Sequence, residues 1–123
     1  MVNQDRNVFA ACMVAAGDVD AMVTGLTRNY HVALDEITRV LDPDPDSRVF
    51  GLSLVLGQDK TLFVSDTAVN ELPDSEQLAD IAQQTAAVAR QMGHEPRVAL
   101  ISFSNFGNPA LPRSQLVSNA VKI

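Results

Sequence analysis

Apolar residues recur every three or four positions in three stretches of the chain, which is the spacing of an amphipathic helix. A fourth, shorter helix is predicted after a proline-rich loop near the C-terminus. The predicted helices are 6–16, 30–41, 75–92 and 113–121. Gly17 is a natural stop for the first, and either Thr27 or Asn29 is placed to cap the second. Asp74 and Gln77 have the spacing of a capping box for the third.

Shorter apolar stretches between these helices predict β-strands. They are 19-VDAMVT-24, 48-RVFGLSLVLG-57, 60-KTLFVSD-66 and 97-RVALISF-103. The connection 57-GQDK-60 is short and turn-rich, so the two middle strands are expected to form a hairpin. Alternation of strands with helices predicts an α/β fold with a mostly parallel sheet and an antiparallel hairpin. The chain begins with a helix and stops at 121-VKI-123, so we expect a single segment, 1–123, of a larger domain that is truncated at both ends.

Composition narrows the classes of function. The 123 residues include 46% hydrophobic residues and have a net charge of −6, which fits a folded core and disfavours nucleic-acid or anionic-membrane partners. The single cysteine, Cys12, excludes an internal disulfide and fits a reducing cytoplasm. No apolar run approaches the roughly 20 residues of a membrane helix.

The first candidate site is the turn 24-TGLTRN-29, at the carboxyl end of a predicted strand, where open α/β sheets bind ligands. Thr24 and Thr27 supply hydroxyls, Gly25 permits close approach of the backbone, and Arg28 supplies a cationic fork. The following helix begins here, so its free N–H groups favour an anion. The alternative is a capped helix with a solvent-exposed arginine.

The second candidate site is the loop 102-SFSNFGNP-109, whose composition could form a backbone nest for phosphate. Its polar members and the cation that follows are Ser102, Ser104, Asn105, Gly107, Asn108 and Arg113. An ordinary turn-rich loop is an equally good interpretation. At a third strand end, Asp66 either orients a hydroxyl or caps a turn, and the cap is favoured. His31 and His94 lack partners at ligand spacing, so no metal site is predicted.

Three blocks in order resemble the phosphate acetyl/butyryl transferase family: 20-DAMVTGLTRNY-30, 64-VSDTAVNELPDSEQLADIA-82 and 94-HEPRVALISFSNFGNP-109. They are similar to that family's "DG-LV-G", "FAD-AVN--P" and "EPRVA-LS-S--GS" patterns. The variants TGLTRNY and SFSNFGNP resemble a subgroup, the C-terminal domain of bacterial NADP-dependent malic enzymes. The resemblance implies the family's three-layer α/β/α fold, of the isocitrate/isopropylmalate dehydrogenase-like type.

The resemblance also implies a function. The domain would bind acetyl-CoA as an allosteric effector of a malic enzyme that converts malate to pyruvate. NADP and Mg²⁺ or Mn²⁺ would then bind the catalytic part of the same parent chain. The alternative is an active phosphate acetyltransferase, which moves acetyl between CoA and phosphate. A further alternative is a structural oligomerisation module.

Five residues match positions of the family's cleft: Thr24, Gly25, Ser102, Ser104 and Gly107. With their neighbours and two arginines, ten residues are proposed to bind the acyl-CoA or its phosphate. They are Thr24, Gly25, Thr27, Arg28, Asn29, Ser102, Ser104, Asn105, Gly107 and Arg113. Asn105 stands where the family usually has Thr, and Asn108 stands where it has Ser or Gly. These two differences weaken the case for phosphoryl-acceptor chemistry. The family's catalytic Ser-Arg and Asp lie in a later segment, so no catalytic or metal-binding residue is assigned, and the segment alone is expected to be inactive. The parent is expected to be a cytoplasmic homo-oligomer.

Overall fold

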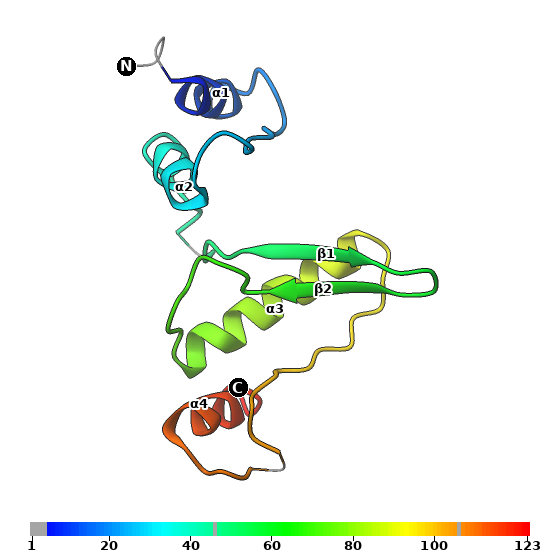
Figure 1. Ribbon diagram of the computed structural model, residues 1–123. Helices are drawn as coiled ribbons and strands as arrows, with labels where there is room; N and C mark the ends of the chain where they lie inside the picture. Colours follow the sequence, from blue (N-terminus) through cyan, green and yellow to red (C-terminus); the bar gives the residue numbers. More distant parts are fainter. Residues whose placement is uncertain (1–4, 46, 106) are drawn as a thin grey trace. The chain divides into compact units, whose positions relative to one another are not determined.

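A computed structural model describes residues 5–45, 47–105 and 107–123. The chain divides into two compact units, Met1–Ser47 and Arg48–Ile123. Figure 1 shows the helices and strands of each unit. The units are described separately below.

The first unit contains two helices, α1 (Arg6–Ala15) and α2 (Tyr30–Thr38). The Asp5 carboxylate caps α1 by accepting hydrogen bonds from the backbone N–H groups of Asn7 and Val8. Asn29 caps α2, because its side-chain oxygen accepts from the backbone N–H of His31 at 3.2 Å. Of the two caps that the sequence allowed for α2, Asn29 is therefore the one used.

The second unit contains a hairpin and two helices. The hairpin strands are β1 (Leu52–Leu56) and β2 (Thr61–Ser65), and the helices are α3 (Ser75–Gln91) and α4 (Pro112–Ala120). The strands pair antiparallel, with Leu52 opposite Ser65 and Leu56 opposite Thr61. The predicted hairpin and the Asp74–Gln77 capping box of α3 are both confirmed.

The predicted parallel strands are absent from the described residues. Residues 19–24 and 97–103 form no strand, and the sheet contains only β1 and β2. The expectation of a mostly parallel sheet is therefore wrong for these residues, while the α/β class and the antiparallel hairpin hold. A strand is defined by its pairing with a neighbour, and neither segment has a neighbouring strand within the described residues.

The buried core is small and made mainly of alanine. Among the described residues, the buried apolar side chains are Ala11, Ala33, Ala79, Ile81, Ala86, Ala89 and Ala120, and no large side chain is fully buried. Many large apolar side chains are exposed instead, including Val23, Ile101 and Phe103. Small buried residues let other elements approach closely, and large exposed ones leave apolar surface uncovered.

Candidate functional site

Arg28 joins three parts of the first unit. Its guanidinium donates to the Asp5 carboxylate at 2.6 Å and also contacts the Glu36 carboxylate. Asp5 precedes α1, Arg28 lies in the turn before α2, and Glu36 lies on α2. The turn 24–29 is thus tied to both helices through one cation.

A polar chain continues this cluster into the interior of the unit. The Asn7 side-chain amide donates to Glu36 at 2.7 Å, and the Thr24 hydroxyl donates to the Asn7 side-chain oxygen at 2.5 Å. Asn7 and Glu36 are each only 8% exposed. A buried carboxylate needs partners of this kind, because its desolvation is costly without them.

The charges in this cluster affect what Arg28 could bind. The hydrogen bond from Arg28 holds the pKa of Asp5 below its usual value, and Asp5 in turn raises the pKa of Arg28. Two carboxylates face one guanidinium, so the cluster has a formal charge of −1. An incoming phosphate would have to compete with Asp5 and Glu36 for the same donor. Sequence reasoning identified Arg28 but missed both of its acidic partners, since they are distant in the sequence.

The turn itself has an unusual backbone. Gly25 has φ of 140° and Leu26 has φ of 67°, a left-handed conformation that is uncommon for a residue other than glycine. The Thr27 N–H donates to the Gly25 carbonyl at 2.9 Å. The turn is therefore tightly folded, which agrees with the requirement for glycine at position 25.

The second candidate loop lies in the other unit. Asn105 and Asn108 exchange two backbone hydrogen bonds of 2.9 and 3.0 Å, and Gly107 between them has φ of 84°. The Ser102 hydroxyl accepts from the backbone N–H of Ser104 at 3.3 Å. The Ser104 hydroxyl is buried and has no hydrogen-bond partner within the described residues. A buried, unpartnered hydroxyl is unusual and leaves a polar group free for a ligand or water.

Arg113 is exposed in the first turn of α4, where the N-cap residue Leu111 has no capping side chain and the Ser114 hydroxyl accepts from the Leu111 N–H at 3.0 Å. Its guanidinium has no ion-pair partner among the described residues. The backbone N–H groups of a first helical turn have no intrahelical acceptor. Arg113 is therefore the cation of the predicted set that remains open to an anion.

The predicted ligand residues thus form two groups. Thr24, Gly25, Thr27, Arg28 and Asn29 belong to the first unit, and Ser102, Ser104, Asn105, Gly107 and Arg113 belong to the second. That both groups contact one ligand stays a prediction.

Asp66 caps the turn that follows β2, as the sequence favoured. One carboxylate oxygen accepts from the Gly51 N–H at 2.7 Å, and the other accepts from the Asn70 backbone and side-chain N–H groups, both at 2.6 Å. Longer hydrogen bonds come from the N–H groups of Ala68 and Val69, at 3.3 and 3.2 Å. Burial alone would raise the pKa of Asp66, but the hydrogen bonds from Asn70, Gly51 and Val69 outweigh it and lower that pKa.

Gly51 completes this turn because it leaves room for the carboxylate. A Cβ added at Gly51 would lie 2.6 Å from the Thr67 hydroxyl and 3.0 Å from the Asp66 carboxylate. The Asn70 side chain also donates to the Val49 carbonyl at 3.0 Å. Asp66 and Asn70 therefore hold the start of the hairpin against the loop that follows it.

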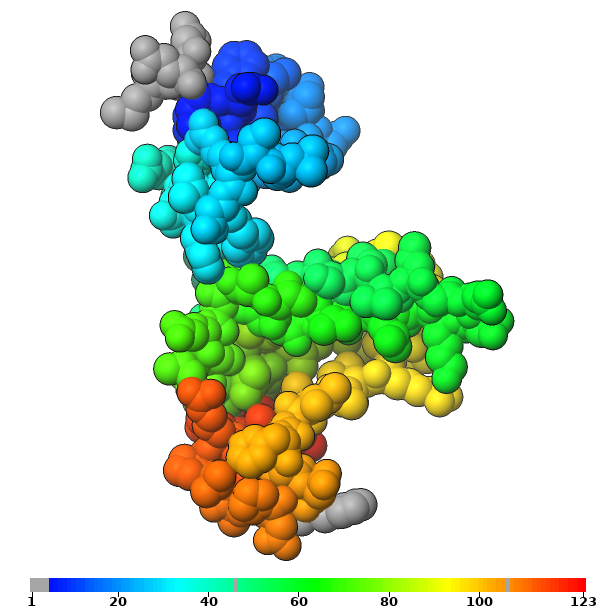
Figure 2. Space-filling model, in the orientation of Figure 1, coloured from blue at the N-terminus to red at the C-terminus, as the bar shows by residue number. Residues whose placement is uncertain are grey.

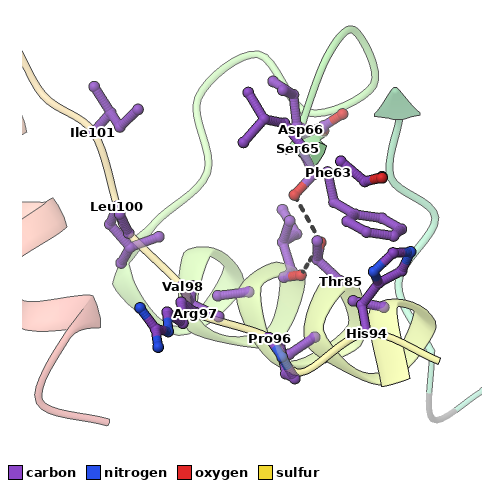
Figure 3. A pocket seen from close by; sticks show the side chains of 18 of the residues that line it. Phe63, Ser65, Asp66, Thr85, His94, Pro96, Arg97, Val98, Leu100 and Ile101 are labelled. Atoms are coloured by element: carbon purple, nitrogen blue, oxygen red, sulfur yellow. Dashed lines mark hydrogen bonds between the residues drawn. The ribbon is translucent and has the colours of Figure 1, made fainter. Parts of the chain in front are cut away.

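A groove that sequence reasoning missed lies beside β2. It has a volume of about 590 Å³ and is lined by β2, the apolar face of α3 and the segment 94–101. Figure 3 shows the Ser65 hydroxyl hydrogen-bonded to the Thr85 hydroxyl, and His94 lying against Phe63. The Ser65–Thr85 distance is 2.7 Å and the two ring centroids are 5.5 Å apart. The signal that could have found it is the apolar run VALISF, which requires cover on both faces.

Metal-binding and membrane-spanning features are not found in the described parts of the chain. No group of three or more His, Cys, Asp or Glu side chains there could hold a metal ion. No helix within residues 5–45, 47–105 and 107–123 is long and apolar enough to cross a membrane.

Comparison with known proteins identifies the family. The family model described as phosphate acetyl/butaryl transferase matches residues 1–123, the whole chain. The chain belongs to this family.

The relatives of this chain include two types of enzyme. The chain is 53% identical to the NADP-dependent malic enzyme of Rhizobium meliloti over 123 residues, which is all of this chain and 16% of that protein. It is 31% identical to the phosphate acetyltransferase of Bacillus subtilis over 97% of this chain and 37% of that protein. The chain therefore spans a small part of the malic enzymes that it matches.

A solved structure supports the same family. The EutD phosphotransacetylase from Staphylococcus aureus matches with a TM-score of 0.72 and 28% sequence identity. The match covers 94% of this chain and 36% of that chain. The α/β fold of this family member is thus similar to part of a phosphotransacetylase.

Proposed function

We propose that this chain is the phosphotransacetylase-like regulatory part of an NADP-dependent malic enzyme, and that it binds acetyl-CoA as an effector. The observation that carries the proposal is the high identity to two of the malic enzymes; the Escherichia coli malic enzyme, at 36%, is as similar as the Synechocystis phosphate acetyltransferase. Identity is 53% and 44% with the malic enzymes of Rhizobium meliloti and Rickettsia prowazekii, over the whole chain. It is 36% or lower with the phosphate acetyltransferases of Synechocystis and Bacillus subtilis.

The parent protein would oxidatively decarboxylate malate to pyruvate, with NADP and Mg²⁺ or Mn²⁺ in its catalytic part. Acetyl-CoA would act through this segment by binding two states of a homo-oligomer with different affinities. The coupling free energy of such an effector is typically about 1–3 kcal/mol, which corresponds to a 5- to 150-fold change in affinity.

Two loops are proposed to contact the effector. Arg113 and the Ser102–Ser104 region would bind phosphate and thioester groups, which is supported by the open guanidinium of Arg113 and the unpartnered hydroxyl of Ser104. Arg28 in the turn 24–29 would supply a second cation. Its ion pairs with Asp5 and Glu36 mean that it would bind an anion only by exchanging at least one carboxylate.

The test is calorimetric titration of acetyl-CoA into the full-length protein that contains these residues. Arg113→Ala should weaken binding by about tenfold or more, the loss expected for one charge-assisted contact. Arg6→Ala is a matched control, since Arg6 is another exposed arginine in the first turn of a helix. Absence of acetyl-CoA binding, or equal losses in the two variants, would reject the proposed site.

A pair of variants in the other loop separates a ligand role for Arg28 from a purely structural one. Arg28→Ala removes the cation, whereas Asp5→Asn frees the cation from one competitor and keeps a capping side chain on α1. If Arg28 binds the effector, the first variant weakens binding and the second strengthens it. Weakening by both variants would instead show that the intact cluster matters only for the fold.

The second candidate is an active phosphate acetyltransferase, which the family match and the likeness to a solved phosphotransacetylase favour. Thiolate attack of CoA on acetyl phosphate needs cations and hydroxyls that hold the phosphate in place. Purified full-length protein separates the two functions directly. Formation of acetyl-CoA from acetyl phosphate and CoA supports the transferase, and NADP reduction with malate that responds to acetyl-CoA supports the regulatory part.

A further inference from the structure

The polar chain that links Glu36, Asn7 and Thr24 has a fixed hydrogen-bond direction. The Glu36 carboxylate can only accept hydrogen bonds, so the part of the Asn7 side chain that faces it at 2.7 Å must be the NH₂ group. The Asn7 side-chain oxygen therefore faces Thr24 and accepts the proton of its hydroxyl at 2.5 Å. A threonine hydroxyl has only one proton to donate but can also accept hydrogen bonds. Toward a ligand, Thr24 is therefore an acceptor and not a donor.

The charges around Thr24 agree with this direction. Arg28 is ion-paired with Asp5 and Glu36, so two carboxylates face one guanidinium. A phosphate at Thr24 would add negative charge to this cluster, and its oxygens would meet a hydroxyl that has no proton left to donate. A ligand N–H or O–H group meets neither penalty, because it can donate to the Thr24 oxygen. While Arg28 keeps its two carboxylates, the position therefore suits a hydrogen-bond donor rather than an anion.

An exposed apolar side chain lies two residues beyond Thr24. Leu26 is fully exposed and has φ of 67°, and the Thr27 N–H donates across it to the Gly25 carbonyl at 2.9 Å. This is a γ-turn with a positive φ, the rare and strained type. Such strain persists where the surrounding structure holds it, and it is concentrated at ligand sites. In Figure 2 the segment between α1 and α2 lies at the surface of the first unit, where a ligand can reach it.

An uncharged, largely apolar chain with N–H donors fits an acceptor oxygen beside an exposed leucine. Acetyl-CoA, the effector in the proposed function on which this inference rests, has such a chain: its pantetheine arm carries two amide N–H groups among methylene groups. We propose that Thr24 and Leu26 receive the pantetheine arm. An amide N–H of the arm donates to the Thr24 hydroxyl oxygen, and methylene groups pack on Leu26. Asn7 is then a positioning residue, because it acts through the orientation of the Thr24 hydroxyl.

Calorimetric titration of the full-length protein with two ligands tests the role of Thr24. Acetyl-CoA contains the arm, whereas an adenosine bisphosphate corresponds to the charged end of CoA without it. Thr24→Val should weaken acetyl-CoA binding by about 3- to 10-fold, the loss expected for one uncharged hydrogen bond, and leave bisphosphate binding unchanged. Thr24→Ser should keep the acetyl-CoA affinity. Thr38→Val is the matched control and should affect neither ligand, because Thr38 is also exposed and donates its proton to the Leu34 carbonyl.

The two ligands separate failure of this inference from failure of the proposed function. Equal weakening of both ligands by Thr24→Val would place Thr24 at the charged end of CoA and overturn the inference. Acetyl-CoA binding that is unchanged in Thr24→Val would overturn it as well, while leaving the proposed effector in place. If the wild-type protein did not bind acetyl-CoA, the proposed function itself would fail, and the inference with it.

Leu26→Gly separates a ligand role for this side chain from a structural one. Glycine adopts a positive φ without strain, so the variant should not lower the midpoint of urea denaturation. Acetyl-CoA binding should nevertheless weaken by about fivefold, as expected when a ligand covers part of a leucine side chain. Unchanged acetyl-CoA affinity would remove Leu26 from the site. Weaker binding together with a lower midpoint would make its role structural, which also contradicts the proposal.

Discussion

Asp66 offers the sharpest test of how this fold is held together. Its two carboxylate oxygens accept five hydrogen bonds, from Gly51, Ala68, Val69 and twice from Asn70. Asp66→Asn keeps the size of the side chain but replaces one acceptor oxygen with an NH₂ donor. If the remaining side-chain oxygen at position 66 stays toward Gly51, the new NH₂ group faces the two N–H groups of Asn70. Those groups donate to the Asp66 carboxylate at 2.6 Å in the wild type, and they would then meet a donor instead of an acceptor.

The magnitude follows from the bonds that are lost. Hydrogen bonds to a charged group contribute about 1.5–3 kcal/mol each, but bonds that share one acceptor are not additive. The side chain is partly exposed, so water compensates some of the loss. We expect Asp66→Asn to lower the free energy of opening this turn by about 2–3 kcal/mol, which corresponds to faster exchange by roughly 30- to 150-fold.

The assay is hydrogen exchange at the backbone N–H groups of Gly51 and Asn70, measured by NMR. Asp59→Asn is the matched control, because it makes the same charge change in the exposed hairpin turn. The control should leave both exchange rates unchanged. If Asp66→Asn changed them no more than Asp59→Asn, the carboxylate would not be what holds the start of the hairpin to the loop.

The same carboxylate predicts a pH dependence. Its pKa in the folded protein is lowered from the ordinary value of 3.8, so its contribution is present in full above that value. The contribution is lost as the pH falls through the lowered, folded pKa. After correction for the intrinsic pH dependence of exchange, protection at Gly51 should therefore fall below about pH 4 in the wild type. The loss should be much smaller in Asp66→Asn, which has no carboxylate at this position.

Two further predictions concern Gly51 in the Asp66 turn and Asn29, the N-cap of α2. Gly51→Ala should destabilise the second unit by about 1–3 kcal/mol in urea denaturation, because its Cβ would lie 2.6 Å from the Thr67 hydroxyl, and an unchanged midpoint would show that the turn adjusts freely. Asn29→Ala should lower the stability of the first unit by about 1 kcal/mol, because α2 loses its N-cap. The loss would be measured by circular dichroism, with Thr27→Ala as the control. Equal effects of the two variants would mean that Asn29 is not the cap.

Helices and the hairpin could be predicted because their signals are local. Gly17 and Gly93 have positive φ just beyond α1 and α3, and Asp74 and Gln77 form the capping box. Boundaries were less accurate: α2 ends at Thr38, whereas the apolar pattern continues to Leu41. The 3.6-residue period and capping side chains specify a helix through residues close in sequence, so no distant partner is needed.

Parallel strands could not be established in this way. The apolar runs at 19–24 and 97–103 have the composition of buried strands, yet within the described residues they have no strand partners. A hairpin finds its partner across a short turn, but a parallel strand depends on segments far away in the chain. Composition therefore indicated a tendency to form strands without supplying the pairing.

For the candidate site, the sequence by itself determined the residue types and their order. It identified the turn 24–29, the loop 102–109 and the capping role of Asp66. Only the tertiary structure showed that Arg28 is held by Asp5 and Glu36, from 23 and 8 residues away, and that Arg113 is left open. Ion pairs between distant residues depend on how helices pack, and local sequence patterns contain no information on that packing.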